Sequence, residues 1–271
     1  MRRSLHPSAF VSPGAVLGEG VSIGPCVVVE EDVVIGDNCQ IHAFASIKRY
    51  TRMGTGNIVH SYAAVGGIPQ DLKFAGEVSF LEIGNNNTIR EFATMHRGTD
   101  GGGGSTRIGD NNLFMAYTHV AHDCRIGNGV IMSNNATLAG HVLLQDGAIL
   151  GGLSAVHQFS RIGRYAFVGG MTGVAQDLPP YMLAVGDRSG IHGPNIVGLR
   201  RLNVPVTTVA AVRAAFRVIW LSGVPRKEAL ARVEEEYGHI PQIQELIAFV
   251  RESPRGVLAA AARHSGNGAA D

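Results

Sequence analysis

Four histidines and one aspartate lie within a short stretch of the chain: His119, His122, Asp123, His141 and His157. Imidazole exchanges a proton near neutral pH, so it suits the removal of a proton from an alcohol. A neighbouring carboxylate can orient the ring, and a glycine N–H that no side chain shields can stabilise an oxyanion. These residue types therefore favour acyl transfer to a hydroxyl group.

The elements that must carry these residues follow a period of six. Apolar residues recur at every sixth position over 11–65, again over 83–95, and again over 108–174, where the frame is shifted by one. The fifth position of each hexad is usually small or β-branched, so the first and fifth positions are predicted to face inward. A helix needs a period near 3.6 and an ordinary strand a period of 2, so neither explains the pattern.

A strict period of six predicts a parallel β-helix. Each hexad supplies one short strand and one turn, and three hexads close a triangular coil. Glycine often follows the first position, as in Gly24, Gly36, Gly54 and Gly66. We interpret these glycines as the residues that accept strained backbone at the corners.

Two interruptions of the period predict external loops, near 66–82 and near 99–107. The first loop is rich in functional side chains and is unlike an idle spacer. The second contains the sequence TDGGGGSTR, which is typical of a flexible linker. The frame resumes unchanged after the first loop and is shifted by one residue after the second.

The period ends after residue 180, and three later segments have helical spacing, at about 208–221, after Pro225 and after Pro241. We therefore predict a β-helix over 1–190 and a C-terminal helical domain over 191–271. The last dozen residues are small and polar and are expected to fray.

The period also predicts which polar residues meet. Residues eighteen apart occupy the same place on successive coils, about 4.8 Å from each other. Asp123 is therefore expected to stack on His141, and His122 on Gly140, with Gln158 one coil further. None of the histidines, nor Asp123, falls on an inward position. A base, a carboxylate and a bare glycine amide are thus predicted to share one wall.

Two other interpretations fit the same histidines. Outward histidines on a repeat protein are often ordinary solvated surface. Alternatively, three imidazoles, here His119, His122 and His141, hold zinc between subunits in some β-helix enzymes. Metal analysis and a chelator test on activity distinguish these cases.

Composition limits the class of protein further. The 271 residues include 23 Lys and Arg against 22 Asp and Glu, a balance that predicts no nucleic-acid partner. The three cysteines are unclustered, which argues against a disulfide framework and indicates a reducing compartment. The N-terminus lacks the apolar core of a signal peptide, and no apolar run reaches the ~20 residues of a membrane span. We expect a cytoplasmic protein without membrane insertion.

Six motifs carry a resemblance to a known family. They are QDLKFAGE (70–77), IREFATMHRGT (89–99), HVAHDC (119–124), NNATLAGHV (134–142), GGLSAVHQF (151–159) and GVAQDLPPY (173–181). On these motifs the chain closely resembles the bacterial UDP-N-acetylglucosamine acyltransferases that begin lipid A biosynthesis. The resemblance covers essentially the whole length.

The resemblance implies a left-handed parallel β-helix with a helical C-terminus, assembled as a homotrimer with its active sites between subunits. It implies transfer of an (R)-3-hydroxyacyl chain from acyl carrier protein to the 3-hydroxyl of UDP-N-acetylglucosamine. No separate cofactor or metal is expected, because the carrier's own phosphopantetheine holds the acyl group. His122 matches the family's general base, Asp123 its partner and Gly140 its oxyanion amide.

The resemblance also assigns substrate contacts. Asp71 and Lys73, with Gln70 beside them, match contacts to the sugar. Gly170 matches the position that sets acyl length, where glycine leaves the groove long. The remaining matches surround the sugar and diphosphate (His119, His141, His157, Gln158), the pantetheine arm (Gly152) and the uridine phosphate (Asn195, Arg201).

Two positions depart from the usual family pattern near the uridine. Val197 stands where a glutamate is usual, and Leu202 where a second consecutive arginine is usual. The departure bears on the nucleotide contacts and on the sugar. The alternatives are an N-acyltransferase acting on a 3-amino UDP-sugar, and a β-helix that is non-catalytic or binds metal. Arg200, Arg201, Arg213 and Arg217 are candidates for docking the acidic carrier protein.

Overall fold

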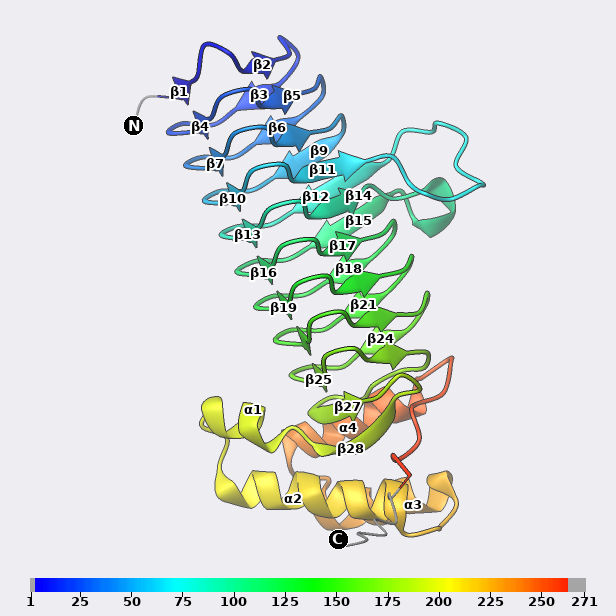
Figure 1. Ribbon diagram of the computed structural model, residues 1–271. Coiled ribbons are helices and arrows are strands. Elements are labelled where there is room, and N and C mark those ends of the chain that lie inside the picture. The colour runs from blue at the N-terminus through cyan, green and yellow to red at the C-terminus, as the bar shows by residue number, and fades with distance from the viewer. Residues whose placement is uncertain (1–2, 263–271) are drawn as a thin grey trace, which may run out of the picture.

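The hexads form three parallel sheets that enclose a triangular prism, with helices packed at its C-terminal end (Figure 1). The computed structural model of the chain describes residues 3–262. We name the sheets A, B and C in the order in which the chain visits them within a coil. The predicted parallel β-helix is confirmed.

Sheet A has eleven strands: β1 (Ser4–Leu5), β4 (Ser22–Ile23), β7 (Gln40–Ile41), β10 (Ile58–Val59), β13 (Thr88–Ile89), β16 (Leu113–Phe114), β19 (Ile131–Met132), β22 (Ile149–Leu150), β25 (Phe167–Val168), β27 (Met182–Val185) and β28 (Gly190–Pro194). Sheet B has nine: β2 (Phe10–Val11), β5 (Val28–Val29), β8 (Ser46–Ile47), β11 (Ala64–Gly67), β14 (Thr94–His96), β17 (His119–Val120), β20 (Thr137–Leu138), β23 (Ala155–Val156) and β26 (Gly173–Val174). Sheet C has eight: β3 (Val16–Leu17), β6 (Val34–Ile35), β9 (Thr51–Met53), β12 (Phe80–Ile83), β15 (Ser105–Ile108), β18 (Arg125–Ile126), β21 (Leu143–Leu144) and β24 (Arg161–Ile162).

Strand register confirms that eighteen residues make one coil. His119 lies opposite Thr137, and Thr137 lies opposite Ala155. The first and fifth hexad positions are buried through most of the prism, as predicted. One column of fifth positions differs, because Asn57, Asn87 and Asn112 occupy it and are buried. Each asparagine Oδ1 accepts a hydrogen bond from the backbone N–H one coil further on, so these three oxygens are paired inside the core.

The interpretation of the corner glycines is confirmed at Gly66, where φ is 90°, but its physical reason was wrong for Gly24, Gly36 and Gly54. The left-handed backbone falls on the fourth hexad position, which is usually not glycine; φ is 63° at Phe44, for example. Gly36 and Gly54 follow the first position and have no positive φ. They are needed because a Cβ on Gly36 would lie 2.6 Å from the backbone of Gly54 on the next coil. Close approach of the coils, not strain, excludes a side chain there.

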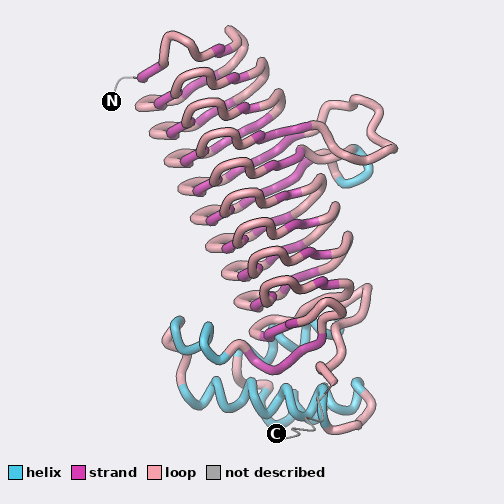
Figure 2. The backbone as a smooth tube through the Cα atoms, in the orientation of Figure 1, coloured by secondary structure: helices cyan, strands magenta, loops and turns pink. Residues whose placement is uncertain are grey.

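Both predicted loops leave the prism on the same side, after sheet B, and lie next to each other (Figures 1 and 2). The first runs between β11 and β12. The second contains a short 3-10 helix, Asp100–Gly102, whose N-terminus is capped by Thr99. Gly98 N–H donates to Phe80 O, and Phe80 N–H donates to Gly104 O, so the two loops are hydrogen-bonded to each other at their bases.

The C-terminal region contains the three predicted helical segments. They are α2 (Val206–Phe216), which continues as a π-helix over Arg217–Leu221, α3 (Arg226–Tyr237) and α4 (Pro241–Arg251). Two elements were not predicted, the short helix α1 (Ile196–Arg201) and the antiparallel pair of β27 with β28. The predicted boundary between the β-helix and the helical domain, after residue 190, falls inside β28, a strand of sheet A. This boundary therefore stays a prediction.

The predicted fraying of the last dozen residues is wrong at Ala261, whose N–H donates to Ile191 O at 2.9 Å. Residues 263–271 lie outside the described part of the chain. Among residues 3–262, none of the helices has the length and apolarity needed to cross a membrane.

Candidate active site

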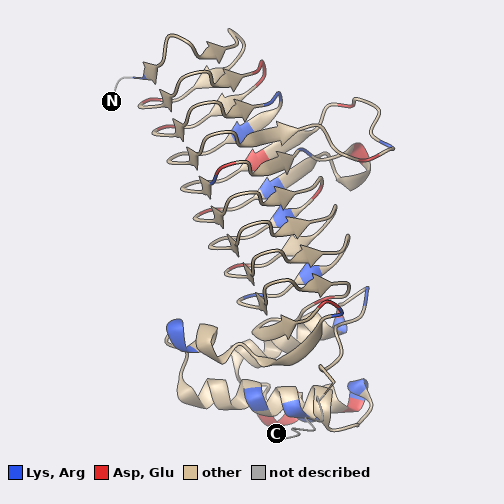
Figure 3. Cartoon of the chain, in the orientation of Figure 1, with Lys and Arg blue, Asp and Glu red and all other residues tan. Residues whose placement is uncertain are grey.

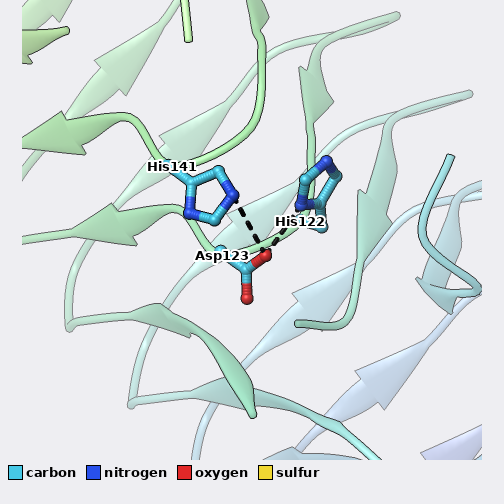
Figure 4. Close-up of side chains that lie close together, drawn as sticks. All are labelled: His122, Asp123 and His141. Atoms are coloured by element: carbon cyan, nitrogen blue, oxygen red, sulfur yellow. Dashed lines mark hydrogen bonds and ion pairs between the residues drawn. The ribbon is translucent and has the colours of Figure 1, made fainter. Parts of the chain in front are cut away.

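His122, Asp123 and His141 meet at the corner between sheets B and C, which we call the B–C corner (Figure 4). His122 Nδ1 lies 2.7 Å from Asp123 Oδ2. An ionised carboxylate only accepts hydrogen bonds, so Nδ1 carries the proton and Nε2 keeps its lone pair. This arrangement prepares His122 to accept a proton at Nε2.

Asp123 is held from a second side by the 99–107 loop. Thr99 N–H donates to Asp123 Oδ1 at 2.8 Å, and Thr99 Oγ1 donates to Oδ2 at 2.7 Å. Gly102 lies directly over the carboxylate, where a Cβ would be 1.9 Å from Asp123 Cγ. Asp123 is consequently only 5% exposed, although its hexad position faces away from the prism core. The linker interpretation of this loop was therefore wrong, because the loop buries and fixes the carboxylate.

Gly140 lies next to the His122 ring, as the eighteen-residue spacing predicts. A Cβ on Gly140 would be 2.7 Å from His122 Cε1, so the ring occupies the space of the missing side chain. Gly140 is the third residue of its hexad. At the corner between sheets C and A, backbone N–H groups of third residues donate to side chains; Asn128 N–H, for example, donates to Asp146 Oδ1. Gly140 N–H has no such acceptor among residues 3–262. An unpaired amide at this position is available to a substrate oxygen.

Three further histidines near His122 are held neutral. Burial lowers the pKa of His141 and of His119, and it lowers the pKa of His96 to about 4. His141 Nε2 is 3.6 Å from Asp123 Oδ2, too long for a hydrogen bond, so of these two histidines His122 makes the hydrogen bond to the carboxylate. His119 Nδ1 lies 2.7 Å from Thr94 Oγ1, and its ring packs edge-on against His96.

A cavity of about 620 Å³ opens beside these residues. Asp71 and Lys73 of the first loop line it together with His141 and Phe159. The His141 ring stacks on Phe159 with centroids 4.5 Å apart, one coil further along the same corner. Asp71 and Lys73 thus face the histidine cluster across the cavity, whereas Gln70 is exposed and does not line it.

The remaining sites fall into two groups on the prism. His157 and Gln158 lie at the B–C corner and are exposed; His157 Nδ1 is 3.0 Å from Gln158 O. Gly152 and Gly170 lie at the other edge of sheet B, at its corner with sheet A, where they stack on successive coils. A Cβ on Gly170 would be 3.4 Å from Gly152 O. One chain alone does not bring these glycines to the histidine cluster.

Asn195 and Arg201 lie together in a second cavity of about 580 Å³, next to sheet A and α1. The cavity is largely apolar, and Val197 and Leu202 also line it. Asn195 is partly committed to the fold, because Oδ1 caps α1 at Gly198 N–H and Nδ2 donates to Tyr165 O. The Arg201 guanidinium has no ion-pair partner among the described residues.

The alternative that His119, His122 and His141 hold zinc can be compared with the positions of these side chains. Among residues 3–262, one cluster places three potential ligand atoms within 4.8 Å of one another, namely His122, Asp123 and His141. His119, the third imidazole of the alternative zinc interpretation, is not part of that cluster. The Nδ1 proton of His122 already satisfies the Asp123 carboxylate, so the arrangement is complete as a hydrogen-bonded pair.

Sequence reasoning missed several residues that build the site. Thr99 holds Asp123, and Thr106 Oγ1 accepts the Asp123 N–H at 2.7 Å. Thr94 contacts His119. Thr94 and Thr99 belong to the motif IREFATMHRGT, so the motif located them, but its spacing gave no role to either side chain.

Comparison with known proteins supports one assignment. Residues 177–258 match a family model described as UDP-N-acetylglucosamine O-acyltransferase, domain 2, and residues 105–140 match the bacterial transferase hexapeptide repeat. The chain is 44% identical over 254 residues to an acyl-[acyl-carrier-protein]–UDP-N-acetylglucosamine O-acyltransferase of Anaeromyxobacter dehalogenans, covering 94% of this chain and 99% of that one.

Solved structures agree. The chain is similar to LpxA from Acinetobacter baumannii, with a TM-score of 0.91 at 38% identity, over 94% of this chain and 99% of that chain. It is similar also to a UDP-N-acetylglucosamine acyltransferase of Bacteroides fragilis, with a TM-score of 0.91 at 41% identity and the same coverage. The predicted left-handed parallel β-helix with a helical C-terminus is thereby confirmed.

Proposed function

Because the chain belongs to the family of acyl-[acyl-carrier-protein]–UDP-N-acetylglucosamine O-acyltransferases, we propose that it transfers an (R)-3-hydroxyacyl chain from acyl carrier protein to the sugar 3-hydroxyl. This is the first step of lipid A biosynthesis. The observation that carries the chemical part is the 2.7 Å contact between His122 Nδ1 and Asp123 Oδ2, with the carboxylate fixed by Thr99. It leaves His122 Nε2 free as the general base.

The reaction begins with removal of the proton from the sugar 3-hydroxyl. A hydroxyl is too weak an acid to attack a thioester unaided, so His122 Nε2 takes its proton as the new C–O bond forms. The imidazolium that results is stabilised by Asp123, whose three donors keep the carboxylate in place. Collapse of the tetrahedral intermediate breaks the C–S bond, and the proton on Nε2 passes to the leaving pantetheine sulfur.

Gly140 supplies the oxyanion amide. Its N–H has no acceptor in the described chain and lies beside the His122 ring, so base and donor can act on one carbonyl carbon. One oxyanion donor contributes on the order of 10²-fold to kcat. The absence of a side chain at Gly140 serves both the oxyanion donor and the base. It leaves the Gly140 N–H unshielded, and it leaves room for the His122 ring, which a methyl group would displace.

The sugar is bound on the cavity side of the cluster. Asp71 and Lys73 contact it from the first loop, with Gln70 beside them, and His141 faces it from the coil. His119, His157 and Gln158 surround the sugar and diphosphate. Neutral His141 and His119 can donate or accept hydrogen bonds there without repelling the protonated base.

The acyl chain and the uridine require parts of the prism away from the B–C corner. Gly152 contacts the pantetheine arm and Gly170 leaves room for a long acyl chain, while Asn195 and Arg201 bind the uridine phosphate. A homotrimer with active sites between subunits accounts for this separation, because a neighbouring copy can present these residues to the His122 corner. Light scattering on the purified protein tests the trimer.

The acidic carrier protein docks on the helical region. Arg200, Arg213 and Arg217 line one cavity of about 320 Å³ beside α2. Figure 3 shows basic residues on α1 and α2. Docking there supplies positive charge locally, although the chain as a whole is nearly neutral.

Product analysis tests the function. Purified protein is incubated with several hydroxyacyl carrier proteins and UDP-N-acetylglucosamine, and the products are weighed by mass spectrometry. The proposal expects an ester-linked acyl sugar and a free carrier thiol. A parallel incubation contains a 3-amino UDP-sugar; an amide product there, with no ester from UDP-N-acetylglucosamine, would favour the N-acyltransferase alternative. The departures at Val197 and Leu202 bear on this choice of sugar. Absence of any acylated sugar would leave a scaffold or a metal-binding protein.

A further inference from the structure

Arg97 is a buried cation that the mechanism above does not use. It follows β14 in the motif IREFATMHRGT and is only 8% exposed. Its Nε has no hydrogen-bond partner among residues 3–262, and burial lowers the pKa of the guanidinium. The carboxylates of Glu30 and Glu77 favour the charged form of Arg97, but neither forms an ion pair with it. A buried charge without an ion pair is costly, so other contacts must help to stabilise it.

Two aromatic rings flank the guanidinium. Arg97 Cζ lies 5.2 Å from the ring centroid of Tyr50, two coils earlier, and 5.5 Å from that of Phe74 in the first loop. A cation over a ring is attracted by the negative charge of its face, most strongly where water is excluded. Phe74 is next to Lys73, so this contact fixes the part of the loop that faces the cavity.

The backbone around Arg97 holds both ends of the same loop. Arg97 N–H donates to Gly67 O at 3.0 Å where the loop begins, and Gly98 N–H donates to Phe80 O at 3.0 Å where it ends. The next residue, Thr99, donates to Asp123. One short segment thus joins the sugar-binding loop to the residue that orients the base.

We propose that Arg97 is a positioning residue that holds the 66–82 loop over the cavity, so that Asp71 and Lys73 meet the nucleotide sugar. It does so through Phe74 and touches no reacting atom. The inference rests on the proposed function for the identity of the sugar. It predicts an effect on binding of the sugar and none on the acyl donor.

The test uses the full chain with two variants and their combination, Arg97→Met, Phe74→Leu and the double variant. Calorimetry without acyl donor gives the Kd for UDP-N-acetylglucosamine, and kinetics give kcat and both KM values. Loss of one cation–ring contact should raise the Kd and the sugar KM about tenfold. The donor KM and the pH profile of kcat should not change. Arg97→Lys should recover part of the loss.

The double variant separates positioning from general damage. If both residues act through one contact, the Kd of the double variant should be no higher than that of the single variant with the higher Kd. Arg226→Met is the matched control, because Arg226 also lies over a ring, that of Trp220 at 5.6 Å, and burial lowers its pKa too, but it belongs to α3, outside the cavity and the loop. The Kd of this variant should remain within twofold of wild type.

An unchanged Kd in Arg97→Met overturns the inference, as does a double variant whose losses multiply. If Arg97→Met does not fold, Phe74→Leu alone decides, because Phe74 lies on an external loop; an unchanged Kd there overturns the inference as well. Failure of the wild-type protein to form product, with sugar binding intact, would count against the proposed function and not against the role of Arg97.

Discussion

Substitution of Gly140 by alanine should impair the general base His122 by displacing its ring, although His122 itself is unchanged. The added Cβ would lie 2.7 Å from His122 Cε1 and 2.8 Å from Nε2, whereas ordinary contact begins near 3.4 Å. The ring must therefore retreat by about 0.7 Å. Its Nδ1–Oδ2 distance to Asp123, now 2.7 Å, would then approach or exceed the normal limit for a hydrogen bond.

The magnitude follows from that displacement. Weakening a hydrogen bond to a charged group costs about 1.5–3 kcal/mol, and an error of 1 Å in a catalytic group costs about 10²-fold. We expect Gly140→Ala to lower kcat about a hundredfold while the protein remains folded. Steady-state kinetics give kcat, and thermal unfolding gives the control for stability.

A double variant isolates the cause. If alanine acts by moving the ring, Gly140→Ala combined with His122→Ala should be no slower than His122→Ala alone. A further loss in the double variant would instead indicate damage to the oxyanion amide. The reasoning is refuted if Gly140→Ala keeps wild-type kcat, or if its crystal structure retains the 2.7 Å contact between His122 and Asp123.

Three other substitutions test separate parts of the account. Thr99→Val removes one of three hydrogen bonds to the Asp123 carboxylate and should lower kcat about tenfold with little change in KM; a kcat equal to wild type would exclude an orienting role. His96 has a pKa lowered to about 4, so its share of the stability is present above about pH 6.5 and is lost as the pH falls toward 4. His96→Phe should remove about 2 kcal/mol of the pH dependence between pH 8 and pH 5, measured by urea unfolding at fixed protein concentration; an unchanged slope would contradict this. Gly170→Leu should shift the preference toward shorter acyl chains when hydroxyacyl carriers compete, and an unchanged product ratio would remove Gly170 from the acyl groove.

The period of six made much of the site predictable. No interruption falls between residues 108 and 174, so counting by eighteen placed Gly140 beside His122 and His141 near Asp123. The observed contacts agree with this counting, because the parallel strand register places residues eighteen apart directly opposite each other on successive coils. Counting worked wherever the frame was continuous.

Counting could not place what lies outside the coils. Asp71, Lys73 and Thr99 lie in or at the start of the external loops, whose path depends on contacts with the coils and not on periodicity. The burial of Asp123 was missed for the same reason, since its hexad position faces outward and only the path of the loop covers it. The family resemblance supplied Asp71 and Lys73, while Thr99 required the structure.

The C-terminal region shows a different limit. The proline-initiated helices were recognisable from their starts, Pro225 before α3 and Pro241 at the start of α4. The β27–β28 pair and α1 were not, because α1 is only six residues long and the strand β28 is shaped by its antiparallel neighbour and by Ala259–Ala261. Short elements that tertiary contacts determine leave little signal in the sequence.

The role of His122 as general base is the centre of the account. The rate of ester formation by His122→Ala, under saturating donor and sugar and with its folded state and oligomeric state verified, tests this role most directly. The account predicts a loss of at least 10²-fold relative to wild type. Turnover at the wild-type rate would contradict it.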